Sequence, residues 1–148
     1  MKIRRIRKVD IPDVTKIVAR NYSQKSASNA REEISGTFSR DPYRPRFIVC
    51  EKEGRIRGFG GYSQSRINYH IYEIFWLNVD PQYQNRGMGT KMMRELISQI
   101  KSKKGEYSAA SIILLTSTNP NYFSKRFGFK TLQKSRGEKG HLMSLTLR

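Results

Sequence analysis

The segment Gln84-Asn85-Arg86-Gly87-Met88-Gly89 has the residue types of a loop that binds a diphosphate. It follows an apolar run that predicts a strand and precedes apolar residues at helical spacing. The first turn of a helix carries backbone N–H groups without internal partners, and the helix dipole adds partial positive charge there. Gly87 and Gly89 let a phosphate approach without a Cβ in the way, and Arg86 adds charge at the mouth. We therefore predict an anion site here; the alternative is an ordinary glycine-containing turn.

Two other phosphate-binding loops do not fit this segment. A P-loop needs Gly-Lys followed by Ser or Thr after its second glycine, whereas Gly89-Thr90-Lys91 has the reverse order. The dinucleotide-binding pattern needs a third glycine, and Met92 holds that place. The glycines thus predict a different strand–loop–helix unit.

The elements that must position this loop follow from the spacing of apolar residues and from the turn residues. We predict a strand at residues 2–7, a helix capped by Asp10, and a second helix that begins at Ser28 or Asn29. Three further strands, at residues 47–50, 56–62 and 69–79, predict an antiparallel meander. The glycines of the second of these indicate a bulge or a close backbone approach.

The second half of the chain alternates helices with strands. A long helix follows the loop and ends at Gly105, and the apolar run at residues 111–116 predicts a strand parallel to residues 69–79. A short helix at residues 119–127 ends at Gly128, and strands at residues 129–133 and 141–147 close the fold. The pattern predicts one α/β (α+β) domain over residues 1–148, with a mixed, mostly antiparallel sheet of about seven strands flanked by four helices.

The amino-acid composition limits the classes of protein to which the chain can belong. No apolar run reaches the roughly 18 residues of a membrane span, and the N-terminal segment lacks the apolar region of a secretory signal. Cys50 is the single cysteine, and His70 and His141 are far apart, so we expect no disulfide, no metal site and a cytoplasmic location. The net charge of +17 attracts anions, and it fits either solubility or a nucleic-acid-bound partner.

Two motifs and the order of elements resemble the GNAT superfamily of N-acetyltransferases. The first is Val79-Asp80-Pro81 followed by the loop 84–89, and the second is the aromatic helix 122–129, which ends in Gly128-Phe129. The resemblance covers the whole chain. It implies the GNAT fold, in which the strands before and after the long helix splay apart, and acetyl-CoA (coenzyme A) as the cofactor. Irregularity near residues 76–78 would help that splaying.

The resemblance also implies where the cofactor lies. Backbone groups of Leu77 and Val79 are expected to pair with the pantetheine arm. The amides of residues 85–90 are expected to hold the pyrophosphate, with Asn119 and Phe123 bordering the rest. The full set of expected cofactor-binding residues is Leu77, Asn78, Val79, Gln84, Asn85, Arg86, Gly87, Met88, Gly89, Thr90, Asn119 and Phe123.

Glu73 is the candidate general base for removing a proton from the amine acceptor. It lies in an apolar run, where burial is expected to raise its pKa. The stretch from Glu73 to Val79 also resembles the catalytic strand of the histone-acetylating branch, with its glutamate in register. The alternative is a strand-edge glutamate paired with a lysine or arginine.

The group that protonates the leaving thiolate is left open. Many family members place a tyrosine five residues before the last Phe, where this chain has Ser124. Ser124 could donate a hydrogen bond, water could protonate the sulfur, or another tyrosine could reach in; for Tyr122 we expect packing, because two residues along a helix point to different faces. An N–H near Val79 is implied for the carbonyl oxygen. Cys50 is expected to be a buried strand cysteine rather than a nucleophile.

The acceptor is not fixed by any motif. We expect a primary amine, with a protein lysine or N-terminus favoured, and Trp76 and Tyr69 as candidates for lining its pocket. A nucleic-acid-associated protein or an RNA-linked acceptor, motivated by the charge, and a small-molecule amine remain alternatives, as do another acyl group and a monomer or homodimer.

Overall fold

The computed structural model of the chain describes residues 1–102, 110–134 and 140–147. Within these ranges one sheet has the strand order β1-β2-β3-β4-β5-β7-β6. Its strands are β1 (Lys2–Arg5), β2 (Arg46–Lys52), β3 (Arg55–Gln64), β4 (Ile71–Val79), β5 (Ile112–Ser117), β6 (Lys130–Gln133) and β7 (His141–Thr146). Neighbouring strands are antiparallel except β4 and β5, which are parallel. The predicted mixed sheet, including its parallel crossover, is confirmed.

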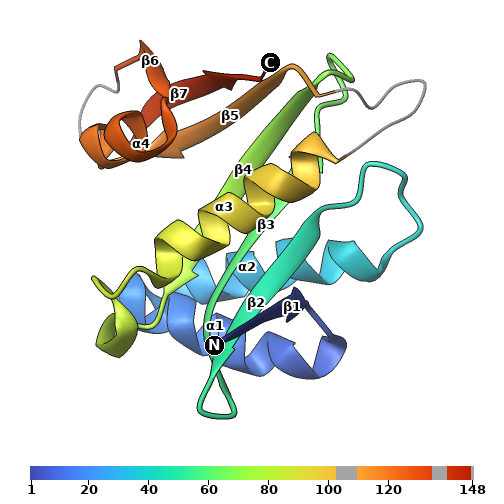
Figure 1. The fold of residues 1–148 in the computed structure, drawn as a ribbon. Coiled ribbons are helices and arrows are strands. Elements are labelled where there is room, and N and C mark those ends of the chain that lie inside the picture. The colour runs from blue at the N-terminus through green and yellow to red at the C-terminus, as the bar shows by residue number, and fades with distance from the viewer. Residues whose placement is uncertain (103–109, 135–139, 148) are drawn as a thin grey trace.

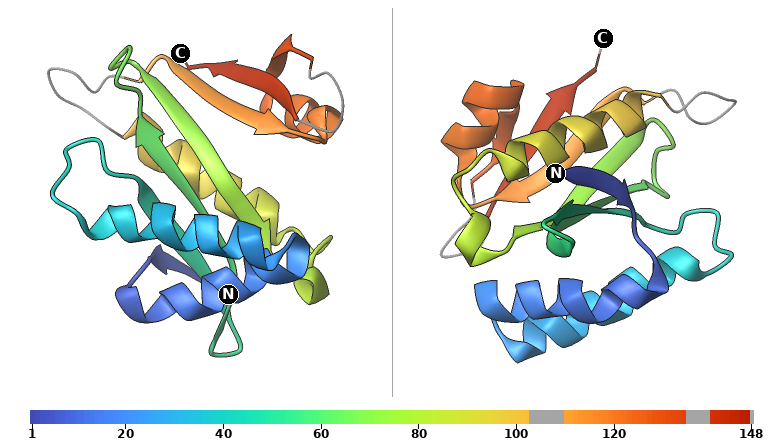
Figure 2. Two further views of the ribbon diagram at one scale, coloured as in Figure 1. Left: turned by 180° about the vertical axis from the view of Figure 1, so that it is seen from behind. Right: turned by 60° about the horizontal axis from the view of Figure 1, so that its bottom comes forward.

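Helices cover both faces of this sheet. The helices α1 (Ile11–Asn21) and α2 (Gln24–Ser35) lie on one face, and α3 (Met88–Lys101) crosses the other (Figures 1 and 2). The last helix, α4 (Pro120–Phe127), contacts β7. Two apolar cores result: Met92, Met93 and Leu96 of α3 pack into one, and α1 and α2 pack on the other with Phe47 and Phe59. None of the helices in the described ranges has the length and apolar character to cross a membrane.

The start of the second helix differs from the prediction, and Asp10, correctly placed at the start of the first, does not form the expected side-chain cap. Ser23 caps α2 by accepting a hydrogen bond from the N–H of Ser26 at 3.1 Å, so the predicted start at residue 28 or 29 was wrong. The polar first turn of α2 concealed this start, because its first buried residue is Ala27. Asp10 stands at the N-cap of α1 but its carboxylate does not cap that helix. It instead accepts the N–H of Arg7 at 2.7 Å and pairs with Arg4.

Strands β4 and β5 begin side by side and then diverge, as Figure 1 shows. Their pairing covers residues 71–73 against residues 112–114 and ends at Glu73 opposite Leu114, although both strands continue. Beyond this point Trp76 has a positive φ of 55°, and the register of β4 on β3 shifts around Gly60. A bulge of this kind bends and twists a strand. The predicted splaying and the predicted irregularity near Trp76 are both confirmed.

The glycines of β3 serve the close approach that the sequence indicated. A Cβ on Gly61 would lie 2.6 Å from the ring of Phe47, and one on Gly58 would lie 2.7 Å from the methyl of Met92. A larger residue at Gly61 would therefore collide with the Phe47 ring of β2, and one at Gly58 with the Met92 side chain of α3. These two glycines let neighbouring side chains lie directly against the β3 backbone.

Candidate active site

The N-terminus of α3 is prepared for an anion. Gly87 precedes the helix with φ 84°, no side chain caps it, and the first turn contains no acidic residue. The first helical bond of this turn runs from the N–H of Lys91 to the carbonyl of Gly87 at 3.1 Å. The preceding amides at residues 88–90 lack acceptors within the helix, so they and the helix dipole favour a negatively charged group.

A cleft of about 750 Å³ opens at this helix end and runs along the diverging edge of β4. Residues of α1, β4, the loop, α3 and α4 line it. Nine of the expected cofactor residues are among them: Leu77, Asn78, Val79, Gln84, Asn85, Gly87, Gly89, Thr90 and Asn119. The cleft thus brings together residues from Asn21 to Arg126, which are far apart in the sequence.

Three expected cofactor residues lie elsewhere. The exposed Arg86 places its guanidinium 5.4 Å from the ring centre of Tyr83. The Met88 side chain is buried in the core beneath α3, so only the backbone of this residue is at the helix end. Phe123 lines a second, adjacent recess instead. The roles of all twelve residues stay predictions.

Val79 presents a backbone donor to this cleft. The N–H of Asp80 donates to the carbonyl of Arg57 on β3 at 2.7 Å. Successive residues of an antiparallel strand point their backbone groups in opposite directions, so those of Val79 point away from β3. Its carbonyl accepts from the side-chain amides of Asn21 and Gln84, each at 3.0 Å. Its N–H is the group that remains to pair with a ligand.

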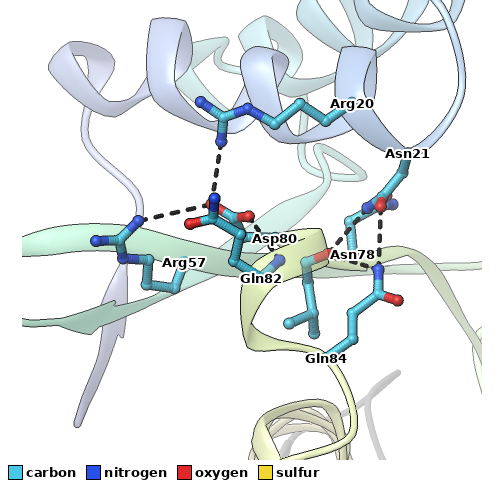
Figure 3. Close-up of polar contacts among 8 residues, drawn as sticks. Arg20, Asn21, Arg57, Asn78, Asp80, Gln82 and Gln84 are labelled. Carbon is cyan, nitrogen blue, oxygen red and sulfur yellow. Dashed lines mark hydrogen bonds and ion pairs between the residues drawn. The ribbon is translucent and has the colours of Figure 1, made fainter.

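Asn21 joins α1 to the loop. Its side-chain amide donates to Oδ1 of Asn78 and to the Val79 carbonyl, and its Oδ1 accepts from Nε2 of Gln84, all at 3.0 Å (Figure 3). Both polar atoms of the Asn21 side chain are therefore satisfied. The first residue of the loop is held against the end of β4 by a residue 63 positions earlier.

Asp80 anchors the segment between β4 and the loop. Its side chain is 3% exposed and lies 3.0 Å from Arg20 and 3.6 Å from Arg57, one partner on α1 and one on β3 (Figure 3). It also accepts the N–H of Gln82 at 3.1 Å, which caps the short turn Pro81–Tyr83. A buried carboxylate with these partners fixes the direction in which the chain leaves β4. The Val-Asp-Pro motif is therefore a positioning device.

A second recess of about 350 Å³ lies between the diverging strands. Tyr22, Leu77 and Asn78 line both hollows, so the recess adjoins the cofactor cleft. Its walls are aromatic, apolar and hydroxyl-bearing, and no carboxylate lines it within the described residues. Its aromatic side chains are those of Tyr22, Phe75, Trp76 and Phe123.

Glu73 lies at the point where β4 and β5 part, as the last paired residue of β4. Its side chain is exposed, so the expectation that it is buried was wrong. Tyr72 and Ile74 point into the core beneath α3, which directs Glu73 to the opposite face. It lines neither recess and forms no ion pair within the described residues. The alternative of a paired strand-edge glutamate is thus not found either.

On α4 the structure favours a residue that the sequence analysis assigned to packing. Tyr122 lines the cleft, and its hydroxyl lies 2.5 Å from Oγ1 of Thr90 in the first turn of α3. Ser124 is exposed and lines neither recess. The signal was the helical spacing of Asn119, Tyr122 and Arg126, which puts all three on one face and in the cleft.

The remaining candidates divide between core and recess. Cys50 is fully buried in a strand, as expected, and burial raises the pKa of its thiol, which disfavours the nucleophilic thiolate. Trp76 lines the second recess and donates its indole N–H to Glu33 of α2. Tyr69 stacks on Tyr43 and lines neither recess. No cluster of three or more potential metal ligands occurs in the described part of the chain.

Comparison with known proteins agrees with this geometry. The profile of the acetyltransferase (GNAT) domain matches residues 44–131. The N-alpha-acetyltransferase RimI of Mycobacterium tuberculosis is 35% identical over 52 residues, which are 34% of this chain and 33% of that protein's length. The match therefore spans about a third of the curated relative.

Solved structures share the fold over nearly the whole chain. A GNAT-family protein from Desulfovibrio desulfuricans superposes with a TM-score of 0.81 at 16% identity, covering 98% of each chain. YncA of Salmonella typhimurium, solved with acetyl-CoA, gives 0.74 at 19% identity and covers 100% of this chain and 94% of its own. The predicted family and fold are thereby confirmed: the chain belongs to the GNAT acetyltransferase family.

Proposed function

We propose that this chain, as one domain over residues 1–148, transfers an acetyl group from acetyl-CoA to a primary amine of a peptide or protein. The observation that carries the proposal is the pair of adjoining recesses at the diverging strands, one of which ends at the uncapped N-terminus of α3. A long polyanionic thioester fits the first recess, and its reactive end reaches the second. The presence of acetyl-CoA in the related YncA structure supports this assignment.

The cofactor is held by backbone groups along its length. The free amides at residues 88–90 bind the pyrophosphate, and Gly87 and Gly89 leave room for it. The N–H of Val79 pairs with the pantetheine arm, in the position that β5 would occupy if the strands had not diverged. Asn119 borders the arm from the other side.

The reaction needs a base for the amine and a donor for the thiolate. Glu73 lies where β4 and β5 begin to diverge, so we propose that its carboxylate accepts the proton of the incoming amine. The amine then attacks the thioester carbonyl, the C–S bond breaks, and the sulfur takes a proton. The Tyr122 hydroxyl, held by Thr90, is the donor on this side of the cleft.

The second recess favours an acceptor that approaches with an uncharged, partly apolar end. Its lining contains the aromatic rings of Phe75, Trp76 and Phe123 and no carboxylate within the described residues. A polycationic small molecule would find no counter-charge there. The match to a protein named as an N-alpha-acetyltransferase supports a peptide N-terminus ahead of lysine. A cytoplasmic location remains part of this proposal.

The test is an acetylation assay with labelled acetyl-CoA and a panel of N-terminal peptides, lysine peptides with blocked N-termini, and polyamines. We expect label on the free N-terminal peptides and micromolar binding of CoA by calorimetry. Absence of CoA binding would refute the enzyme assignment. Label on polyamines alone would refute the proposed acceptor and leave the cofactor assignment standing.

A further inference from the structure

A basic recess lies at the end of the sheet where β2 begins, between the end of α3 and the segment after α2. It has a volume of about 490 Å³ and is bounded by β1, β2, the segment after α2 and the C-terminal half of α3. Three of its lining residues are arginines: Arg5, Arg44 and Arg46. It shares no lining residue with the cofactor cleft or with the second recess. It is therefore a separate feature of the surface.

Strand register brings two of these arginines together. Arg5 of β1 is opposite Ile48 of β2, and Arg46, two residues before Ile48, is opposite Tyr62 of β3. Side chains alternate between the faces of a strand, so Arg5, Arg46 and Tyr62 point to the same side, toward α3. Burial raises the pKa of Tyr62, while the positive charges of Arg46 and Arg5 oppose that rise, as expected for guanidinium groups near the phenol.

Among the described residues that line the recess, none is Asp or Glu, so these positive charges meet no counter-charge from that part of the chain. Within the described ranges neither Arg5 nor Arg46 has a side-chain hydrogen bond or an ion pair. The neighbouring Glu95 accepts the side-chain amide of Gln99 at 3.0 Å, and Asp41 pairs with Arg66. Like charges on adjacent strands repel each other, and an anion bound between them would remove that cost.

The rim of the recess adds an aromatic surface. Phe38, an exposed large apolar residue, lines the recess, and Nζ of Lys8 lies 5.8 Å from its ring centre. Guanidinium groups bind phosphate through paired hydrogen bonds, and an exposed ring beside them offers a base a stacking surface. The volume and the chemistry suit a phosphate ester that carries a flat ring.

We infer that the basic recess binds a nucleotide phosphate, with the phosphate between Arg5 and Arg46 and the base against Phe38. The ligand is either a free nucleotide or one nucleotide of an RNA strand, since both present the same group. The net charge of +17 would steer either toward the protein. Because no residue is shared with the cofactor cleft, this site does not depend on the proposed acetyl transfer.

The experiment compares the wild type with the double variant Arg5→Gln/Arg46→Gln. AMP and inorganic phosphate are titrated by calorimetry, and a labelled oligoadenylate RNA by fluorescence anisotropy at several salt concentrations. Loss of two phosphate contacts should weaken binding by about tenfold or more and lower the salt slope by about 1 to 2. The matched control is Arg31→Gln paired with Lys25→Gln, which removes the same charge from exposed positions on α2.

The probes separate the two sources of the ligand. If AMP binds the wild type and the double variant loses that binding, the site takes a free nucleotide. If AMP does not bind the wild type but the double variant loses RNA binding, the site takes a nucleotide of an RNA strand. Equal weakening in the α2 control, or no binding of any probe, would overturn the inference. Unchanged CoA affinity in the double variant would show that its effect does not arise in the cofactor cleft.

Discussion

At the scale of single residues, the position of Glu73 matters more than its environment. The side chain is exposed, but it marks the end of the β4–β5 pairing, where the thioester and the amine must meet. We predict that Glu73→Gln retains the CoA affinity of the wild type and lowers kcat by about 100-fold, the range for loss of a general base. Calorimetry and steady-state kinetics at neutral pH measure the two quantities.

The control for Glu73 is Glu32, a surface carboxylate of α2 that is also exposed. Glu32→Gln removes the same charge without touching β4 and should leave kcat unchanged. Full activity of Glu73→Gln would remove this residue from the mechanism, and a different group would have to accept the proton.

The positions of Tyr122 and Ser124 lead to opposite predictions about which of them donates the proton. The Tyr122 hydroxyl is in the cleft and contacts Thr90, whereas Ser124 is exposed outside it. We expect Tyr122→Phe to lower kcat about tenfold or more without raising the KM for acetyl-CoA, and Ser124→Ala to have no effect. The reverse pattern in the same kinetic assay would restore Ser124, one of the donors that the sequence leaves open.

These residues show what the sequence could and could not predict about the site. Gly87 and the Val79-Asp80-Pro81 motif were readable, because a loop before a helix has local geometry that few residue types satisfy. The exposure of Glu73 depends on how far the helices extend along β4, and that is a tertiary property. The expected packing of Tyr122 against neighbouring rings is found, but its contact with Thr90 could not be predicted, because the two residues are 32 positions apart in the sequence.

At the scale of elements, the two glycines at the start of α3 have different roles. Gly87 is needed for the backbone conformation, and Gly89 leaves space for the ligand. Gly87 has φ 84° and open space where a Cβ would point, with no atom within 4 Å, whereas Gly89 lies inside the helix near Val79. Gly87→Ala should therefore destabilise the protein by about 1 to 2 kcal/mol, the cost of a left-handed alanine. Urea unfolding checks this value.

Gly89→Ala provides the matched comparison. Alanine favours the helix interior, so the stability of this variant should be equal to or above that of the wild type. The added methyl group lies at the helix end where the pyrophosphate approaches, and CoA affinity should fall about tenfold or more. If Gly89→Ala bound CoA as tightly as the wild type, the phosphate would lie elsewhere.

Element boundaries were predictable where they depend on local chemistry. The end of α4 was predictable, because Gly128 takes the left-handed conformation with φ 82°. The start of α2 was not, because the polar first turn that Ser23 caps shows no apolar periodicity. Asp10 was placed correctly at the start of α1 but with the wrong partner, since its pairing with Arg4 joins two elements that only the fold brings together.

At the scale of the whole molecule, that pairing connects the edge of the sheet to the helical layer. Arg4 lies between two carboxylates, 2.8 Å from Asp10 and 2.6 Å from Glu51, and so ties β1 to α1 and β2. The hydrogen bond from Arg4 holds the pKa of Asp10 below its ordinary value, and the N–H of Arg7 acts in the same direction. Asp10 therefore stabilises the fold in its charged form.

The sign of the pH effect follows from that depression. An aspartate whose native pKa lies below its unfolded value of about 3.9 contributes stability that is fully present above that value. The contribution is lost as the pH falls through the native pKa.

Asp10→Asn should cost about 2 kcal/mol at pH 7, where the charged pair is lost, and less at pH 3. Urea unfolding at both pH values measures the difference, with the exposed Asp13→Asn as the matched control. A penalty that is the same at pH 3 and pH 7 would mean that the Asp10 charge does not carry this stability, and that its side chain acts only by shape and hydrogen bonding.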